Sequence, residues 1–247
     1  MRIHKLTILL LLLVFATLGL TLGQQNQLKK GDAAEAEYAK QLQARHLRFP
    51  TANYDEPDLV DPKKNEARKQ KNRRKNDDNW VGSNGSEWAN ELVRNIEGGI
   101  DLPSLPVAES SYIVLGRVTS AEAHLSQDKR NVYSEFKVSV EKVFKTATAM
   151  SEGIEIVVDR SGGFVKYPNG HSILYRTSHL DMPLSGERYL FFLTSKNEDL
   201  SILTAYQLEA KGVQPLDQAP QFEKYRGATE ETLLENLQKS LVKAAPY

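Results

Sequence analysis

The sequence predicts a mainly β protein: a small antiparallel barrel of five to six strands with a C-terminal helix, preceded by a largely disordered N-terminal segment. Three observations support this fold class. Apolar residues recur with a period of two over much of residues 110–214. Turn residues separate the apolar runs at even spacing, and no helical period lies between them. Residues 24–79 are polar and charged, with few branched apolar residues.

The N-terminus has the residue order of a secretory signal peptide. Arg2, His4 and Lys5 precede an uncharged, leucine-rich run over residues 6–23, and a charged start followed by such a run is typical of signal peptides. We therefore expect an exported protein, periplasmic or secreted, that is cleaved after residue 23. An alternative stays open, because an uncleaved run of this length lies at the lower edge of what can anchor a chain in a membrane.

The composition excludes several classes of site. The chain has no cysteine, so disulfides, thiol catalysis and cysteine-containing zinc sites are ruled out. Its stability must come from an apolar core and satisfied hydrogen bonds. The 32 Lys and Arg residues balance the 32 Asp and Glu residues. Without a global positive charge, no specific binding to nucleic acid is expected.

Residues 24–79 are expected to form a disordered charged segment, because they cannot bury enough apolar surface to offset the entropy of ordering. A basic run stands in its second half, after four acidic residues. This run can contact an anionic surface such as lipid headgroups, or it can be a solvated linker that its own charge keeps extended. The basic residues are Lys63, Lys64, Arg68, Lys69, Lys71, Arg73, Arg74 and Lys75.

Residues 80–109 are expected to form a short helical lead-in to the barrel. Trp80 and Trp88, together with Leu92, Val93 and Ile96, suggest a short amphipathic helix, which Gly98 and Gly99 would end. We expect the two tryptophans to pack against the barrel, although an aromatic ring can also stack on a ligand.

The barrel begins with a predicted hairpin of two long strands. An apolar strand over residues 111–123 contains Gly116, which allows a bend or a bulge. Residues 132–144 alternate between apolar and polar side chains and return as its antiparallel partner. A third strand is predicted over residues 153–160, bounded by glycines.

The rest of the barrel follows from turn residues and apolar runs. Asn169-Gly170 between two β-prone runs predicts a hairpin over residues 164–176. Further strands are predicted over residues 189–193 and 200–210. Residues 215–247 end in a helix whose leucine stripe packs on the barrel or meets a partner protein.

The order of the motifs "IVLGRV", "YSEFKVSVEKVFK" and "GERYLFFL" resembles the netrin-like and tissue-inhibitor-of-metalloproteinases-like modules. These are secreted five-stranded barrels of the oligonucleotide/oligosaccharide-binding (OB) fold, so the resemblance implies an OB-like barrel over about residues 110–210. Disulfides hold those modules together, and the inhibitors engage the protease metal through an N-terminal cysteine. This chain has no cysteine. The resemblance therefore implies the architecture only, and no functional residue carries over.

The stretch "DRSGGFVKYPNGHSILYR", residues 159–176, most resembles a binding site. Its arginines can form an anion pocket together with glycine backbone amides, which a ligand can approach closely. In the alternative interpretation, the glycines make a turn or bulge and the charges are solvated at strand ends. The predicted binding residues are Arg160, Gly162, Gly163, His171, Arg176 and Arg188.

Catalysis has weak support. The common hydrolase, metalloprotease, phosphate-loop and calcium-loop signatures are absent. His171, His179 and Asp181 are the one cluster with a usable set of metal ligands, at a spacing that fits no common signature. The favoured interpretation is that they are surface and hairpin residues.

The sequence thus predicts an exported, non-catalytic β-barrel binding module without a cofactor, for an unidentified protein or glycan partner. Two alternatives stay open. The first is an extracytoplasmic metal-dependent enzyme that uses His171, His179 and Asp181. The second is a membrane-tethered adaptor whose basic run lies against anionic headgroups.

Overall fold

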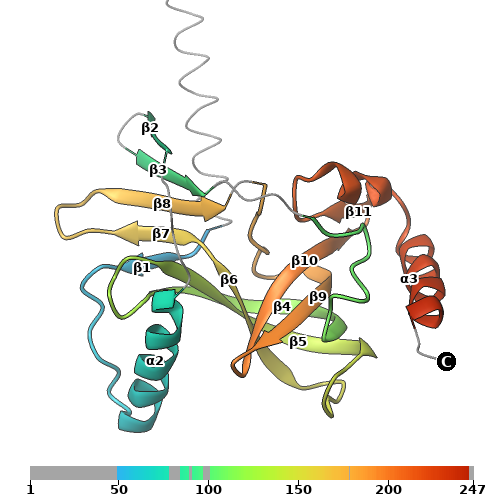
Figure 1. The fold of residues 1–247 in the computed structure, drawn as a ribbon, viewed down its shortest axis with the longest axis horizontal. Coiled ribbons are helices and arrows are strands. Elements are labelled where there is room, and N and C mark those ends of the chain that lie inside the picture. Colours follow the sequence, from blue (N-terminus) through green and yellow to red (C-terminus); the bar gives the residue numbers. More distant parts are fainter. Residues whose placement is uncertain (1–48, 78–83, 89–90, 97–100, 178, 245–247) are drawn as a thin grey trace, which may run out of the picture. The chain divides into compact units, whose positions relative to one another are not determined.

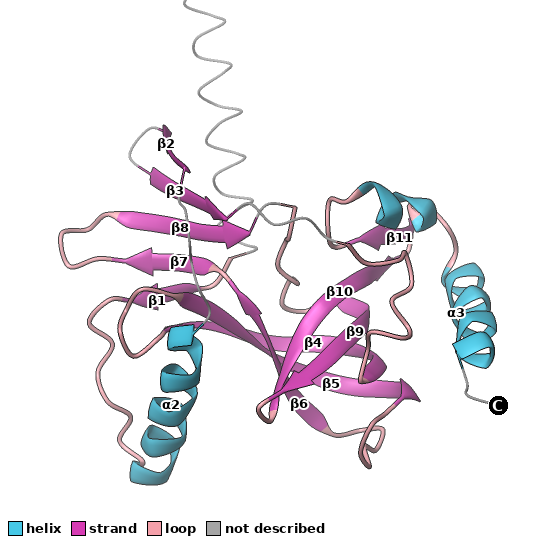
Figure 2. Cartoon of the chain, viewed as in Figure 1, coloured by secondary structure: helices cyan, strands magenta, loops and turns pink. Residues whose placement is uncertain are grey.

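The computed structural model describes residues 49–77, 84–88, 91–96, 101–177 and 179–244. All of them lie in one of the two compact units of the chain, Leu47–Tyr247. Strands predominate among them, as predicted (Figures 1 and 2). The predicted signal peptide and residues 24–48 of the predicted disordered segment lie outside the described residues. In the described part of the chain, no helix combines the length and apolar composition needed to cross a membrane.

A six-stranded sheet contains most of the predicted barrel strands. Its order is β11-β10-β6-β5-β4-β9, and β9 also pairs with β10. The pairings therefore run from β4 through β5, β6, β10 and β9 and return to β4. All are antiparallel except β6 with β10, which is parallel. The strands are β4 (Tyr112–Leu125), β5 (Val132–Lys145), β6 (Glu155–Ser161), β9 (Arg188–Lys196), β10 (Asp199–Glu209) and β11 (Gly212–Pro215).

The apolar faces of these strands form the main core. Phe136, Val138 and Val140 alternate along β5 with side chains that are exposed or half-buried, as the period of two predicts. They pack with Val158 of β6 and Phe191 of β9, among others. The register of β4 against β5 shifts at Gly116, which confirms the predicted irregularity there. A side chain at this position would lie 2.7 Å from the carbonyl oxygen of Ser139, so the strands can pair closely only around glycine.

The predicted hairpin at Asn169-Gly170 is confirmed, but it belongs to a second sheet. Strands β7 (Gly163–Lys166) and β8 (Ser172–Thr177) pair antiparallel across this turn. Their sheet has the order β1-β7-β8-β3-β2, where β1 is Thr51–Asn53. Gly162 and Gly163, with φ of 118° and 146°, turn the chain out of β6 into β7. The two glycines therefore form the turn that one interpretation of this stretch predicted.

The helix predicted within residues 80–109 is wrong for the described part of that segment. Residues Asn84–Trp88 and Glu91–Ile96 are strands, β2 and β3, which pair antiparallel. Strand β3 also pairs in parallel with β8. The free edge of β8 supplies backbone partners, and such a tertiary partner outweighs a weak local preference for helix.

The predicted disorder does not extend over residues 62–77. Helix α2 (Pro62–Arg74) is followed by a short 3₁₀ helix, η1 (Lys75–Asp77). The Asp61 side chain caps α2 by accepting a hydrogen bond of 2.9 Å from the Lys63 backbone amide, and Pro62 stands at the first helical position. The reason for this order lies in the partners of α2 on the sheet, described below.

The C-terminal helix is confirmed as α3 (Glu230–Ala244). Thr229 caps it by accepting a hydrogen bond from the Thr232 amide. Leu233 and Leu237 are fully buried in a second core cluster, which includes Phe192 of β9. A short 3₁₀ helix, η2 (Pro220–Tyr225), contributes to the same cluster. The leucine stripe thus packs against the sheet.

Candidate functional site

Three carboxylates, one buried and two half-buried, gather on one face of the six-stranded sheet. Glu135 of β5 lies directly opposite Asp159 of β6, and Asp199 begins the next strand, β10. The exposed fractions of their side chains are 13%, 2% and 11%. Like charges that lie this close together, with so little exposure to water, are strongly unfavourable unless cations compensate them.

Helix α2 supplies the compensating cations, and Lys71 is central among them. Its Nζ lies 2.7 Å from Glu135 Oε1, 2.9 Å from Asp159 Oδ2 and 3.6 Å from Asp199 Oδ1. One ammonium group thus contacts all three carboxylates, which come from three different strands.

Further cations from the same segment complete the network. Arg68 Nη1 lies 2.9 Å from Glu135 Oε2. Arg74 donates to both oxygens of Asp199, at 2.9 and 3.2 Å. Lys75 Nζ, at the end of α2, lies 3.1 Å from Asp159 Oδ2. Each carboxylate therefore has at least two cationic neighbours.

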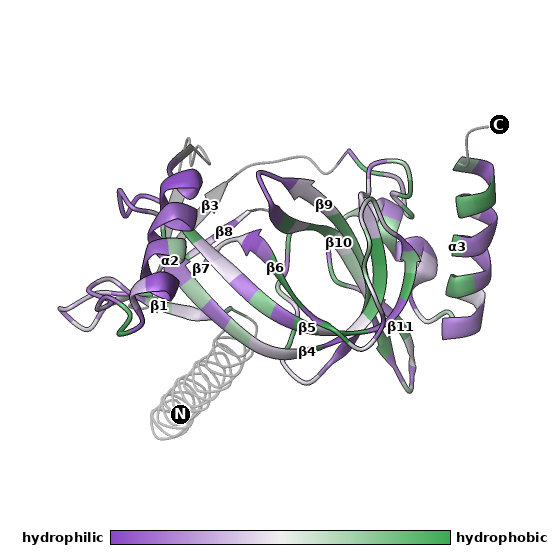
Figure 3. Cartoon of the chain, turned by 90° about the horizontal axis from the view of Figure 1, so that it is seen from below, coloured by the Kyte–Doolittle hydropathy of each residue, from purple (hydrophilic) through white to green (hydrophobic). Residues whose placement is uncertain are grey.

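Charge rather than apolar packing holds α2 in place. The helix is hydrophilic along its length (Figure 3) and has no buried residue. Crowded like charges destabilise an isolated helix of this length. Six of the eight residues in the basic run form ion pairs with carboxylates of the chain itself: Arg68, Lys69, Lys71, Arg73, Arg74 and Lys75. Among the described residues, Lys63 and Lys64 make no such pair.

The pKa values show which charge states this network favours. Burial raises the pKa of Glu135, but Lys71 and Arg68 outweigh burial, and the net pKa lies below its ordinary value. Burial lowers the pKa of Lys71, while Asp159 and Glu135 raise it by more, and the net pKa is raised. The Asp199 pKa is likewise lowered, because Arg74 and its cationic neighbours outweigh burial. All three groups are therefore held charged at neutral pH.

Tyr133 of β5 extends the contact between α2 and the sheet. Its hydroxyl donates a hydrogen bond of 2.7 Å to Asn72 Oδ1, and the ammonium groups of Lys71 and Lys75 lie 5.6 and 5.5 Å from its ring centroid. Burial, together with the charge of Glu135, raises the Tyr133 pKa to about 12. This tyrosine is therefore a neutral packing and hydrogen-bonding group.

A buried histidine adjoins the network. His124 of β4 is 5% exposed, with Nδ1 3.5 Å from Glu56 Oε2 and Nε2 3.6 Å from Glu135 Oε2. Neither ring nitrogen makes a hydrogen bond of good geometry within the described residues. The contact of the Glu56 carboxylate with the His124 ring is the main reason why the pKa of Glu56 lies below its ordinary value. His124 thus links the loop before α2 to the carboxylate face.

A cavity of about 320 Å³ opens beside the C-terminal end of α2. Its walls come from α2, β6, the end of β8, and the turn between β9 and β10. The lining is mostly polar and charged, with four cationic and two acidic side chains. It includes Arg74, Lys75, Asp159, Arg160, Lys196 and Asp199.

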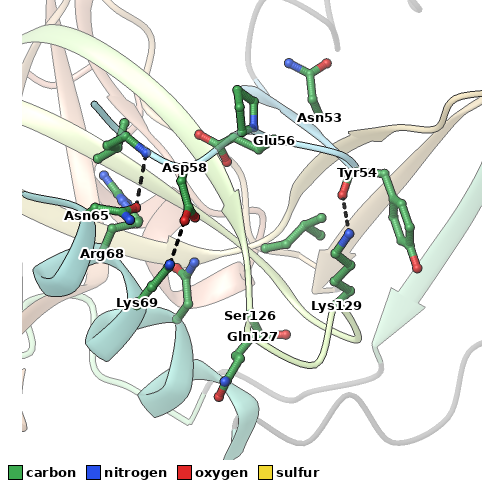
Figure 4. Close-up of a pocket in the computed structure, with 14 residues that line it drawn as sticks. Asn53, Tyr54, Glu56, Asp58, Asn65, Arg68, Lys69, Ser126, Gln127 and Lys129 are labelled. Carbon is green, nitrogen blue, oxygen red and sulfur yellow. Dashed lines mark hydrogen bonds and ion pairs between the residues drawn. The ribbon is translucent and has the colours of Figure 1, made fainter. Parts of the chain in front are cut away.

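A second, smaller pocket of about 200 Å³ lies between α2, the loop over residues 53–59 and the turn after β4 (Figure 4). Its polar groups largely bond to one another. Lys69 Nζ donates to Asp58 Oδ2 at 2.7 Å, and Lys129 Nζ donates to the Tyr54 carbonyl oxygen at 2.8 Å. Lys129 also lies 4.2 Å from the Tyr54 ring centroid. This pocket therefore offers a ligand less unused hydrogen-bonding capacity.

The structure does not bring the predicted anion-binding residues together. Arg160 is 3% exposed and forms a bidentate pair with Asp217, at 2.6 and 2.9 Å, on the wall of the larger cavity. Arg188 instead pairs with Glu141 and Glu230. The remaining predicted residues lie elsewhere. Gly162 and Gly163 form the turn between β6 and β7, His171 is exposed in the hairpin turn, and Arg176 lies within β8.

The predicted metal ligands are also separated. His171 precedes β8, whereas His179 and Asp181 follow it. Across the described part of the chain, no group of three or more His, Cys, Asp or Glu side chains is placed to hold a metal ion. The alternative that uses His171, His179 and Asp181 therefore has no assembled ligand set there.

From the sequence we expected Lys71 in a run that contacts an anionic surface or is a solvated linker, and the pairing of Glu135 and Asp199 with this run was not predicted. A usable signal was present, because Asp61-Pro62 is a helix start and the basic residues at positions 68, 71 and 75 recur at helical spacing.

No protein-family model matches the sequence, and no curated protein is significantly similar to it.

We expect Lys71→Met to destabilise the fold by about 3 kcal/mol, because it leaves buried carboxylates without their shared cation. The free energy of unfolding in urea measures this loss. Lys69→Met is the matched control on the same helix, because its partner Asp58 is 68% exposed and the pair is solvated. Equal effects of the two substitutions would show that the buried cluster has no special role.

We also expect stability to fall in acid as Glu135 is protonated. The Glu135 pKa is lowered in the folded state, so its ion pairs stabilise the fold above the ordinary pKa of 4.5, and this contribution is lost as the pH falls through the folded-state value. Urea unfolding between neutral pH and about pH 3 measures the slope. Glu135→Gln should be less stable at neutral pH and lose less on acidification. A variant with the wild-type slope would contradict this assignment.

Proposed function

We propose that this chain is an exported, non-catalytic binding module. In this proposal the six-stranded sheet is a closed OB-like barrel, helix α2 docks on its acidic face, and the cavity beside α2 is the ligand site. The observation that carries the proposal is the cavity of about 320 Å³ walled by charged side chains from α2, β6 and the β9–β10 turn. This volume lies at the lower end of the usual range for ligand pockets.

The barrel part of the proposal is supported by strand pairing. The cycle β4-β5-β6-β10-β9 returns to β4, and only its β6–β10 pairing is parallel. A partly open five-stranded Greek-key barrel is the architecture of OB folds, which bind ligands on a strand face flanked by loops. The resemblance to netrin-like modules agrees with this architecture. In this proposal the cavity between β6 and the β9–β10 turn serves as the ligand site of such a face.

The shifted pKa values in the cluster beside the cavity all lie further from neutral pH than usual, which favours binding over catalysis by these groups. General acid–base catalysis works best when the pKa of the catalytic group lies near the operating pH. In the cluster beside the cavity, Glu135 and Asp199 have lowered pKa values and Lys71 has a raised one. Their charges are therefore fixed, which suits the recognition of a ligand.

Export is supported by the sequence alone, through the charged start and the apolar run over residues 6–23. A membrane adaptor is less well supported, because six residues of its basic run already pair with carboxylates of the chain. Lys63 and Lys64 are the remaining cations of that run. A protein or glycan partner in the extracytoplasmic space fits the proposal.

We expect the full-length chain to bind a small polar ligand in this cavity. The probes are chitotetraose, inorganic phosphate and a lysine-rich peptide, each titrated while backbone amide resonances are recorded. At least one probe should give saturable shifts confined to the cavity lining. Thr177→Phe, which fills the cavity, should abolish them, whereas Ser172→Phe on the same strand lies outside the lining and should not. No saturable shift with any probe would contradict the proposal.

A further inference from the structure

We propose that the cavity beside α2 binds a tetrahedral oxyanion, namely a phosphate or sulfate group. This inference rests on the proposed function, since it names the ligand class for the same cavity. It follows from three properties of the lining: the balance of its charges, the hydrogen bonds that its acids already accept, and the donors that remain unused.

The lining carries more positive than negative charge. Four cationic side chains, Arg74, Lys75, Arg160 and Lys196, face two acidic ones, Asp159 and Asp199. Asp217, which is not part of the lining, compensates Arg160, so the excess positive charge is that of Lys196. A concave site with an excess of one sign concentrates ligands of the opposite sign, and low-dielectric walls strengthen this effect. The cavity therefore favours an anion.

The acidic side chains of the lining already have partners. Asp159 Oδ1 accepts a hydrogen bond of 2.7 Å from Ser201, and its Oδ2 lies 2.9 and 3.1 Å from the ammonium groups of Lys71 and Lys75. Both oxygens of Asp199 accept from Arg74. A ligand that supplies donors would have to compete with these contacts.

Most of the unused hydrogen-bonding capacity lies with donors; among the acceptors, Asp159 Oδ2 has ion-pair contacts with Lys71 and Lys75 but no hydrogen bond. Lys196 forms no ion pair among the described residues, and Arg74 uses Nε and Nη2 for Asp199, which leaves Nη1 without a hydrogen bond there. Arg160 Nε is buried and has no hydrogen-bond partner. An unpaired buried donor is costly. A ligand rich in acceptor oxygens would use these groups, and arginine guanidinium groups suit phosphate and sulfate oxygens.

The fold holds these donors in place before a ligand arrives. Asp217 fixes Arg160, and Asp199 fixes Arg74. The tight turn between β9 and β10 presents Lys196, with Asn197 and Glu198 at φ of 53° and 71°. Binding therefore orders few side chains, which lowers its entropic cost.

Calorimetric titration of the full-length chain tests the inference. The probes are inorganic phosphate and inorganic sulfate, with phosphoserine and a sulfated disaccharide as organic carriers of the same groups, all at constant ionic strength. We expect saturable binding of phosphate or sulfate. Tighter binding of an organic carrier would identify a covalently attached group as the ligand, and equal or weaker binding would identify the free anion.

Lys196→Gln should weaken binding about tenfold, since it removes one charge-assisted contact. Lys239→Gln is the matched control, because it removes the same charge from an exposed position on α3. Failure of all four anions to bind, or an equal loss in both variants, would overturn the oxyanion assignment. If chitotetraose or the peptide still shifts the cavity amides, the proposed function stands and only the ligand class is wrong. If no probe shifts the cavity amides, the proposed function and the oxyanion assignment are both wrong.

Discussion

Three carboxylates on one face of a sheet, those of Glu135, Asp159 and Asp199, form ion pairs with cations that α2 and the residue after it bring to them. Without the helix, like charges would face one another on a largely buried surface. Without the sheet, the basic helix would repel itself and lack an apolar face to bury. Helix α2 and the acidic face of the sheet therefore stabilise each other. Lys71 is central to this contact, because its ammonium group lies near all three carboxylates.

This dependence separates two kinds of stability within the molecule. The core of β4, β5, β6 and β9 is held by buried apolar side chains such as Phe136 and Phe191, which salt and mild acid affect little. The docking of α2 is electrostatic, and its partly exposed pairs respond to both. Buried ion pairs seldom add net stability compared with apolar packing. Breaking one of these pairs is nevertheless costly, because it leaves a buried charge without its partner.

The sequence predicted those parts of the fold that depend on local pattern. Alternation along β5, the Asn169-Gly170 turn and the leucine stripe of α3 each reflect a period or a turn preference that neighbouring residues specify. Helix α2 could not be predicted in this way, because its partners are distant: Arg68 contacts Glu135, 67 residues away, and Arg74 contacts Asp199, 125 residues away. The same limit applies to the site. Arg160 was expected either in an anion pocket or solvated at a strand end. It is instead buried against Asp217, which comes from beyond the predicted stretch.

The central claim is that Lys71 and Glu135 stabilise each other, and a double-mutant cycle measures this most directly. The free energy of unfolding is determined at neutral pH for wild type, Lys71→Met, Glu135→Gln and the double variant. Mutual dependence predicts a coupling energy of about 1 kcal/mol or more, with the double variant less destabilised than the sum of the single ones. Additivity within about 0.3 kcal/mol would contradict the account, since the helix and the sheet would then be stabilised independently.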